Sequence, residues 1–213
     1  MPRYVKPVLN LTADDVWSAA CAAQRINGAY LKFGNPENKT ANRDLITAML
    51  GNTDSSIQIT DADREQGEVV RTYYKGLTFK ILCGTKLSDF DNTAMVLANR
   101  DVITSTFDLA VIASLPSCFI RASARDSATR RINFAEGGFI GSVGDKVNVS
   151  VEVVKVIYSQ QWNTYYISGI TDTDQAVFFA YKTSIDLGAK INIAGTVKAH
   201  KDNSTQLNRV KVL

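Results

Sequence analysis

Residues 137–213 read GGFIGSVGDKVNVSVEVVKVIYSQQWNTYYISGITDTDQAVFFAYKTSIDLGAKINIAGTVKAHKDNSTQLNRVKVL, and this stretch decides the fold. Near its start, Val147, Val149, Val151 and Val153 alternate with polar residues, the pattern of a half-buried β-strand. The strand is predicted to continue to Tyr158, which makes it long. A long, bent first strand suits a small closed barrel, in which it pairs along both edges.

Four further strands are predicted after the first, with polar turns between them. Their ranges are 162–170, 176–183, 190–199 and 205–213, and Gly195 permits a bulge in the fourth strand of the five. Five strands of this kind, beginning with a long one, predict an OB-fold, a five-stranded Greek-key barrel.

The residues before the barrel carry helical signals from Thr12 to about residue 115. Thr12 is predicted to cap the first helix with its hydroxyl, and Trp17 is expected in the core. Thr60 and Asp63 have the spacing of a capping box. Pro116 is predicted to end the last helix. The predicted helical stretches are 14–32, 41–50, 61–82, 92–100 and 107–115, with a turn at 101–103.

The predicted fold class is therefore α+β, with a helical N-terminal domain followed by a C-terminal five-stranded OB-fold β-barrel. The periodicity changes near Gly137 and Gly138, so the domains are placed at residues 1–131 and 132–213. Residues 1–11, with two prolines, are expected to form an extended arm on the helical domain.

The composition is that of an ordinary soluble protein, with 45% apolar and 21% charged residues and a net charge of +3. No apolar run approaches the ~20 residues of a membrane span, and no signal-type segment is recognised at the N-terminus. We therefore expect a cytoplasmic protein without a membrane partner. Cys21, Cys83 and Cys118 are far apart and set in apolar runs, so we expect buried, free thiols of a reducing compartment.

The sequence offers no constellation for catalysis or for a cofactor. His200 is the single histidine, and neither a Cys-x-x-Cys pair nor a Gly-x-Ser-x-Gly elbow occurs. The GSVGDK stretch lacks the order of a phosphate loop. Asp172 and Asp174 stand in a predicted hairpin turn, where aspartate is common, so we predict no metal, no cofactor and no enzyme activity.

Aromatic residues are concentrated on the second and third predicted strands. Alternation places Tyr165, Ile167, Val177, Phe179 and Tyr181 on one face as core, which leaves three rings on the other. Those three outward rings are Trp162, Tyr166 and Phe178. A slip of one residue in strand register would exchange the two faces, and packing against the helical domain is the alternative role for the outward rings.

Basic residues accompany these rings, and rings interleaved with cations suit single-stranded nucleic acid. Bases stack on rings for roughly 1–3 kcal/mol each while the phosphates follow the cations. The basic candidates on the barrel are Lys155, Lys182, Lys198, His200, Lys201, Arg209 and Lys211. A second cluster, Arg121, Arg125, Arg130 and Arg131, precedes the barrel and is either a solvated connector or a set of phosphate contacts.

The segments GFIGSVGDKV, WNTYYISGI, AVFFAYKT, GTVKAH and TQLNRVKV together resemble the OB module of tailed-phage replication proteins. The whole chain is similar to small phage proteins classed as single-stranded-DNA-binding proteins. The resemblance implies sequence-tolerant binding of single-stranded DNA in the barrel groove by Lys198, His200, Arg209, Lys211 and the aromatic residues. Two features depart from that pattern: the turn between His200 and Thr205 is short, and the last residues, RVKVL, are not acidic.

The resulting prediction is a non-enzymatic OB-fold protein that binds single-stranded DNA in phage replication or recombination, in the host cytoplasm. Its helical domain would mediate self-association, dock replication or recombination proteins, or extend the DNA path through Arg121, Arg125, Arg130 and Arg131. One alternative is a scaffold module of a replication or virion complex, whose barrel binds protein. The other is a nuclease with scattered acidic ligands.

Overall fold

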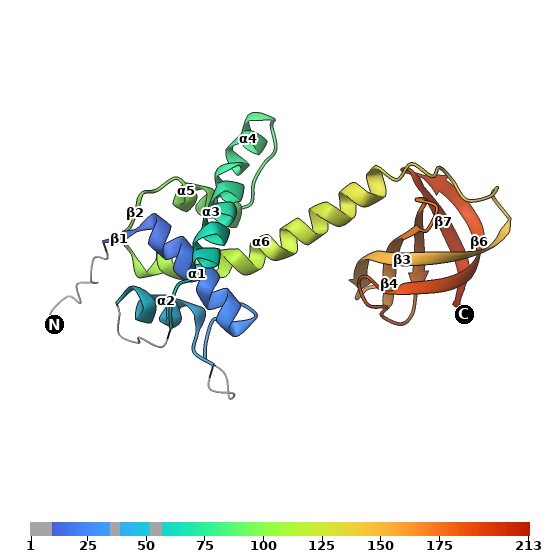
Figure 1. The fold of residues 1–213 in the computed structure, drawn as a ribbon. Helices are drawn as coiled ribbons and strands as arrows, with labels where there is room; N and C mark the ends of the chain where they lie inside the picture. Colours follow the sequence, from blue (N-terminus) through green and yellow to red (C-terminus); the bar gives the residue numbers. More distant parts are fainter. Residues whose placement is uncertain (1–9, 35–38, 52–56) are drawn as a thin grey trace. The chain divides into compact units, whose positions relative to one another are not determined.

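The computed structural model describes residues 10–34, 39–51 and 57–213. The chain divides into two compact units, residues 1–121 and 122–213. The first is helical and the second holds a closed five-stranded β-barrel, which confirms the predicted α+β class (Figure 1). Residues 1–9, most of the predicted N-terminal arm, lie outside the described residues.

The first unit contains helices packed around α1 and a short strand pair. Strands β1 (Leu11–Thr12) and β2 (Val102–Ile103) pair antiparallel, where the sequence had predicted a turn at 101–103. The helices are α1 (Ala13–Asn27), α2 (Asn42–Leu50), α3 (Asp61–Lys75), α4 (Leu77–Leu82), α5 (Asp89–Ala98) and the first part of α6 (Thr106–Asn133).

Helix α1 is central because its alanines let other helices approach closely. Ala19, Ala20 and Ala23 are fully buried, and Trp17 is buried in the same core, as predicted. On α3, Gly67 faces α1 so closely that a Cβ atom there would lie 3.0 Å from the Ser18 nitrogen. Small residues at this crossing therefore set the distance between the two helices.

Helix starts follow the predictions in part. Thr60 and Asp63 form the predicted capping box at the start of α3. Thr12 does occupy the cap position of α1, but its hydroxyl donates to the Asp15 carboxylate, so the predicted cap to a backbone amide is wrong. The predicted helix 61–82 is two helices, because the chain departs from α3 at Gly76 and begins α4 at Leu77.

The prediction that Pro116 ends a helix is wrong, because α6 continues through it to Asn133. Proline removes one backbone hydrogen bond and crowds the preceding turn. Here the residues around it are held by tertiary packing: Ile112 and Leu115 are fully buried, and the Tyr74 hydroxyl donates to the Leu115 carbonyl at 3.3 Å. Burial of this turn outweighs the local cost of the proline.

Within the described residues, α6 is the one helix long and apolar enough, by length and composition, to cross a membrane. This differs from the expectation that no apolar run is long enough for a membrane span. Leu109, Ile112 and Leu115 belong to the buried core of the helical unit. Since core helices of soluble proteins meet the same criteria, this is weak support for a membrane span.

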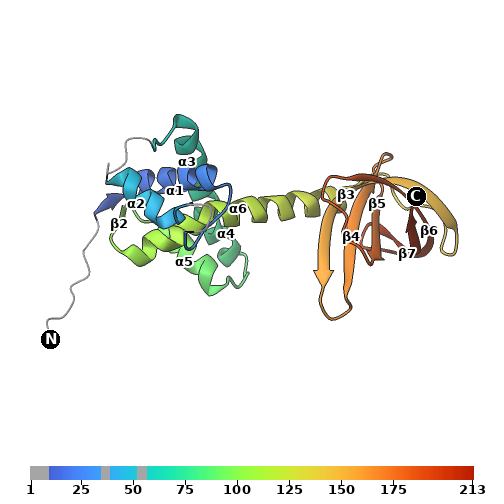
Figure 2. The ribbon, with the colours of Figure 1, turned by 90° about the horizontal axis from the view of Figure 1, so that it is seen from below.

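The second unit contains the barrel. Its strands are β3 (Lys146–Ser159), β4 (Thr164–Thr171), β5 (Ala176–Tyr181), β6 (Lys190–Lys201) and β7 (Ser204–Val212), in the order β3-β4-β5-β7-β6. Neighbours are antiparallel except β5 and β7, which are parallel, and β6 pairs with β3 to close the barrel. This five-stranded mixed barrel agrees with the predicted OB-fold. Figure 2 shows β3 and β4 as neighbouring strands joined by a tight turn.

Strand β3 closes the barrel because it pairs along both edges, as predicted. Val151 pairs with Thr171 of β4 and with Ile191 of β6. A bulge between Val153 and Lys155 bends the strand at this point. Gly169 faces the bend, and its missing side chain leaves room for the sharp curvature.

The last turns of α6, which belong to the second unit, pack against the barrel. Ala128, Ala135 and Ile132 meet Val154, Ile170 and Ala176 in a small apolar cluster. The Asn203 amide, in the turn between β6 and β7, donates to carbonyls at the helix end, including that of Ala135 at 2.9 Å. The end of α6 is therefore a structural part of the barrel unit.

Replacing Gly169 by alanine should destabilise the barrel by about 1–3 kcal/mol, the usual cost of overpacking. A Cβ atom there would lie 2.1 Å from the Val151 Cγ1 atom and 2.8 Å from the Glu152 carbonyl oxygen. Denaturant unfolding of Gly169→Ala measures the effect, with the exposed Ser184→Ala as the matched control. Equal stability of the two variants would contradict the tight bend.

Candidate nucleic-acid interface

The outer face of β4 and β5 carries a pair of aromatic rings. Ile167, Val177 and Phe179 point into the barrel core and are fully buried or nearly so. Tyr166 and Phe178 point outward, half-buried, with ring centroids 5.8 Å apart and planes within 11°. The predicted strand register is thus correct for these residues.

Two cross-strand rows define the surroundings of the ring pair. In one row, Lys155 of β3 pairs with Ser168, which pairs with Phe178. In the other, Ile157 of β3 pairs with Tyr166. We call Lys155, Ile157, Tyr166 and Phe178 the aromatic face; it joins an apolar stacking surface to one ammonium group.

The turn between β3 and β4 adds further exposed rings. Trp162 lies in this turn instead of in the strand predicted for it, and its side chain is 66% exposed. Tyr158, at the end of β3, packs against Tyr165 with ring centroids 4.9 Å apart, and its hydroxyl donates to the Asn163 side chain at 2.8 Å. Sequence reasoning missed Tyr158, although it stands only four residues from Trp162 across a predicted hairpin tip.

The predicted cations of the barrel fall into separate places. Lys155 borders the rings, and the exposed Lys182 directly follows β5. Strand β7 runs parallel to β5 with Phe179 opposite Leu207, so Arg209 lies two residues further, toward the same end as Lys182. Lys198 and Lys211 are exposed on β6 and β7.

Two other predicted barrel residues already have partners. The His200 ring stacks on Phe139 with centroids 4.4 Å apart, and its Nε2 atom lies 3.1 Å from the Gly141 carbonyl oxygen. These contacts hold the segment that leads into the barrel. Lys201 lies 3.9 Å from the Asp202 carboxylate in the turn before β7, an exposed ion pair.

The arginine cluster is dispersed along α6. Arg121 ends the helical unit, where it donates to the Cys118 sulfur at 3.3 Å, whereas Arg125 and Arg130 are exposed. Arg131 makes a bidentate ion pair with Glu152 of β3 at 2.8 and 2.9 Å. Hydrogen bonding to Arg131 lowers the pKa of Glu152, and the same bond raises the pKa of Arg131. Arg131 thus ties α6 to the barrel.

A pocket of about 180 Å³ opens beside the aromatic face, between the end of α6 and β5. One wall comes from α6 and the others from β3, β4, β5 and the turn before β7. Its lining residues are Thr129, Ile132, Asn133, Lys155, Ser168, Val177, Phe178, Asp202 and Ser204. The pocket combines one ring with several hydrogen-bonding side chains, and sequence patterns gave no sign of it.

A second and larger pocket, of about 430 Å³, lies in the helical unit among α1, α3 and α6. Cys21, Ala62, Pro116 and Ile120 provide apolar lining. The Gln24 side-chain oxygen is buried and lacks a hydrogen-bond partner among the described residues. Burial raises the pKa of the Cys21 thiol to about 12, so this thiol stays protonated and unreactive at neutral pH. The predicted burial is wrong for Cys83, which is exposed, and Cys118 is half-buried.

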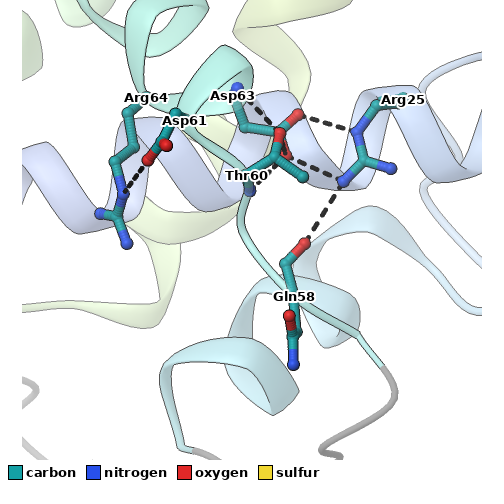
Figure 3. Close-up of polar contacts among 6 residues, drawn as sticks. All are labelled: Arg25, Gln58, Thr60, Asp61, Asp63 and Arg64. Atoms are coloured by element: carbon teal, nitrogen blue, oxygen red, sulfur yellow. Dashed lines mark hydrogen bonds and ion pairs between the residues drawn. The ribbon is translucent and has the colours of Figure 1, made fainter.

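Asp63 borders that second pocket, and both oxygens of its carboxylate accept hydrogen bonds. Figure 3 shows its carboxylate between Arg25 and Thr60. Arg25 donates to both oxygens at 2.9 and 2.8 Å, while the Thr60 amide and hydroxyl donate at 2.9 and 2.7 Å. Burial raises the pKa of Asp63, but these hydrogen bonds outweigh burial and lower it below the ordinary value. We therefore assign Asp63 a structural role.

Within residues 10–34, 39–51 and 57–213, no three His, Cys, Asp or Glu side chains are grouped as metal ligands would be. Comparisons of the chain with protein-family models, with curated proteins and with solved structures found no match.

Replacing Arg25 by alanine should cost about 1–2 kcal/mol of stability at neutral pH, because the buried Asp63 carboxylate loses its two strongest donors. Since its folded pKa is lowered, Asp63 stabilises the fold above about pH 3.9, and this contribution disappears as pH falls through the folded pKa. The difference between wild type and Arg25→Ala should therefore shrink in acid.

Denaturant unfolding at several pH values measures this difference. Arg64→Ala is the matched control, since Arg64 is half-exposed and its nearest carboxylates are 3.8 and 4.0 Å away. The control should lose little stability. A pH-independent loss in Arg25→Ala would contradict the assigned role of the ion pair.

Proposed function

We propose that the barrel binds single-stranded DNA without strong sequence preference, with the aromatic face as its stacking surface. The observation that carries the proposal is the outward pair of Tyr166 and Phe178, nearly parallel, with Lys155 in the same cross-strand row as Phe178. Rings that are half-buried in a barrel wall are rigid, so they lose little entropy when a base stacks on them.

The place of these rings on the fold supports the same proposal. In OB-folds, oligonucleotides bind across the second and third strands and the loops that follow the first and fourth strands. The second and third strands here are β4 and β5, and the loop after the first strand carries Trp162. The exposed Lys182, directly after β5, and Arg209 of β7 lie toward the same end of their neighbouring strands. Their cationic groups are suited to contact phosphates.

The role that follows is binding or coating of single-stranded DNA, with no chemical step, and the resemblance noted in the sequence suggests phage replication or recombination. The helical unit would then recruit other replication or recombination proteins. A test is titration of a labelled dT oligonucleotide at low salt, followed by incubation with Mg²⁺ or Mn²⁺. Binding with an intact strand supports the proposal; absence of binding by folded protein favours a protein-binding scaffold, and cleavage favours a nuclease.

Trp162→Ala should weaken dT binding by roughly 5- to 150-fold, the equivalent of the ~1–3 kcal/mol of one stacked base. The barrel should stay folded because Trp162 is 66% exposed. In the wild type, bound dT should quench the Trp162 fluorescence, whereas the buried Trp17 of the helical unit supplies a constant background.

Leu187→Ala is the control for Trp162→Ala, since Leu187 is also 66% exposed but lies in the connection between β5 and β6. Its affinity should match that of the wild type. Equal affinities for Trp162→Ala and Leu187→Ala would remove Trp162 from the stacking surface.

The slope of log K against log salt measures the salt dependence of dT binding. In Lys182→Gln this slope should be less steep by about 0.7, the value for one phosphate contact to a single strand. The same measurement on Lys198→Gln and Lys211→Gln tests whether the strand continues over β6 and β7. Lys86→Gln, in the helical unit, is the control. An unchanged slope removes the substituted cation from the phosphate path.

A further inference from the structure

We propose that the pocket between the end of α6 and β5 receives one base of the bound strand, and that guanine is the base it accepts best. The inference rests on the proposed function, since it assumes that single-stranded DNA lies on the aromatic face. It adds a preference at one position of a strand that is otherwise held without regard to sequence.

The pocket has the size and composition of a base site. Its volume is about 180 Å³, and it is partly open to solvent, so a base can enter while its sugar and phosphate stay outside. Phe178 supplies an aromatic wall and Ile132 supplies an apolar contact, while hydroxyl, amide and charged groups complete the lining. Proteins read unstacked bases with this combination of rings and hydrogen bonds.

The pocket is preformed because its α6 wall is fixed to the barrel at three places. The Asn203 amide lies within 3.4 Å of the carbonyl oxygens of Ile132, Asn133 and Ala135. Arg131 and Glu152 form the bidentate ion pair. The apolar cluster of Ala128 and Ile132 on the barrel holds the same turns. A rigid pocket can discriminate between bases, since it does not reshape itself around the wrong one.

Guanine is favoured because the lining offers an acceptor and a cation. The Asp202 carboxylate accepts hydrogen bonds only, and the Lys155 ammonium only donates them. Guanine carries two neighbouring N–H groups together with the O6 and N7 acceptors, so it is able to satisfy both side chains. Thymine presents a single N–H group, and a carboxylate opposite its carbonyl oxygens is unfavourable.

Helix α6 also supplies a cation for the phosphate of the inserted nucleotide. Thr129 and Asn133 line the pocket from positions four residues apart, so they share one face of the helix. Arg125 stands one turn earlier on that face and is exposed. Arg125, one member of the predicted arginine cluster, would therefore bind the phosphate of the inserted nucleotide.

The experiment compares dT oligonucleotides of about 15 nucleotides that differ at one central position, which is dT, dG, dA or dC. Wild-type protein should bind the dG strand at least about fivefold more tightly than the dT strand. Asp202→Asn should abolish that preference while it leaves dT binding intact. Asparagine suits this position because Asp202 has φ +49°, a conformation that asparagine tolerates.

Asp186→Asn is the control, because it removes the same charge from an exposed residue that does not line the pocket. It should retain the preference for dG. Equal wild-type affinities for all four strands, or a dG preference that survives in Asp202→Asn, would overturn the inference and leave the proposed function standing. Absence of binding to every strand would overturn both.

Discussion

The closed barrel depends on one strand, β3, which pairs with a different strand along each of its two edges. Val151 and Glu152 of β3 pair with β4 on one edge and with β6 on the other, so the sheet closes at this point. The chain can bend there because of the bulge that follows and because Gly169 has no side chain opposite it. The same bulge sets the register of everything beyond it, and therefore turns Lys155 and Ile157 outward, beside Tyr166 and Phe178.

The end of α6 is the second element that shapes the surface. It covers Val154, Ile170 and Ala176, which are outward positions of the barrel that water would otherwise reach. This cover divides the outer side of β4 and β5 into a closed part beneath the helix and an open part that carries the rings. The pocket lies at the border between the two parts, and Thr129, Ile132 and Asn133 of the helix form one of its walls.

Several features were predictable from the sequence because they rest on local periodicity. Alternation of valines and aromatic residues predicted the strands and the correct face for Tyr166 and Phe178. Helical signals in the sequence were less reliable where tertiary packing determines the structure. Pro116 lies inside α6 because the turns around it are buried, and local sequence rules do not detect that burial. His200 contacts Phe139 and Arg131 contacts Glu152, and both partners are distant in sequence. These structural roles could therefore not be predicted from the sequence.

The short turn between β6 and β7 has a consequence for how the second unit folds. Its Asn203, with φ +60°, supplies hydrogen bonds to the last carbonyls of α6 from some seventy residues further along the chain. Those carbonyls lack helical partners of their own. The final turns of α6 are therefore completed only when the last hairpin is in place, which makes the helix end and the barrel one cooperative unit, with shared protection of their amides from exchange with solvent.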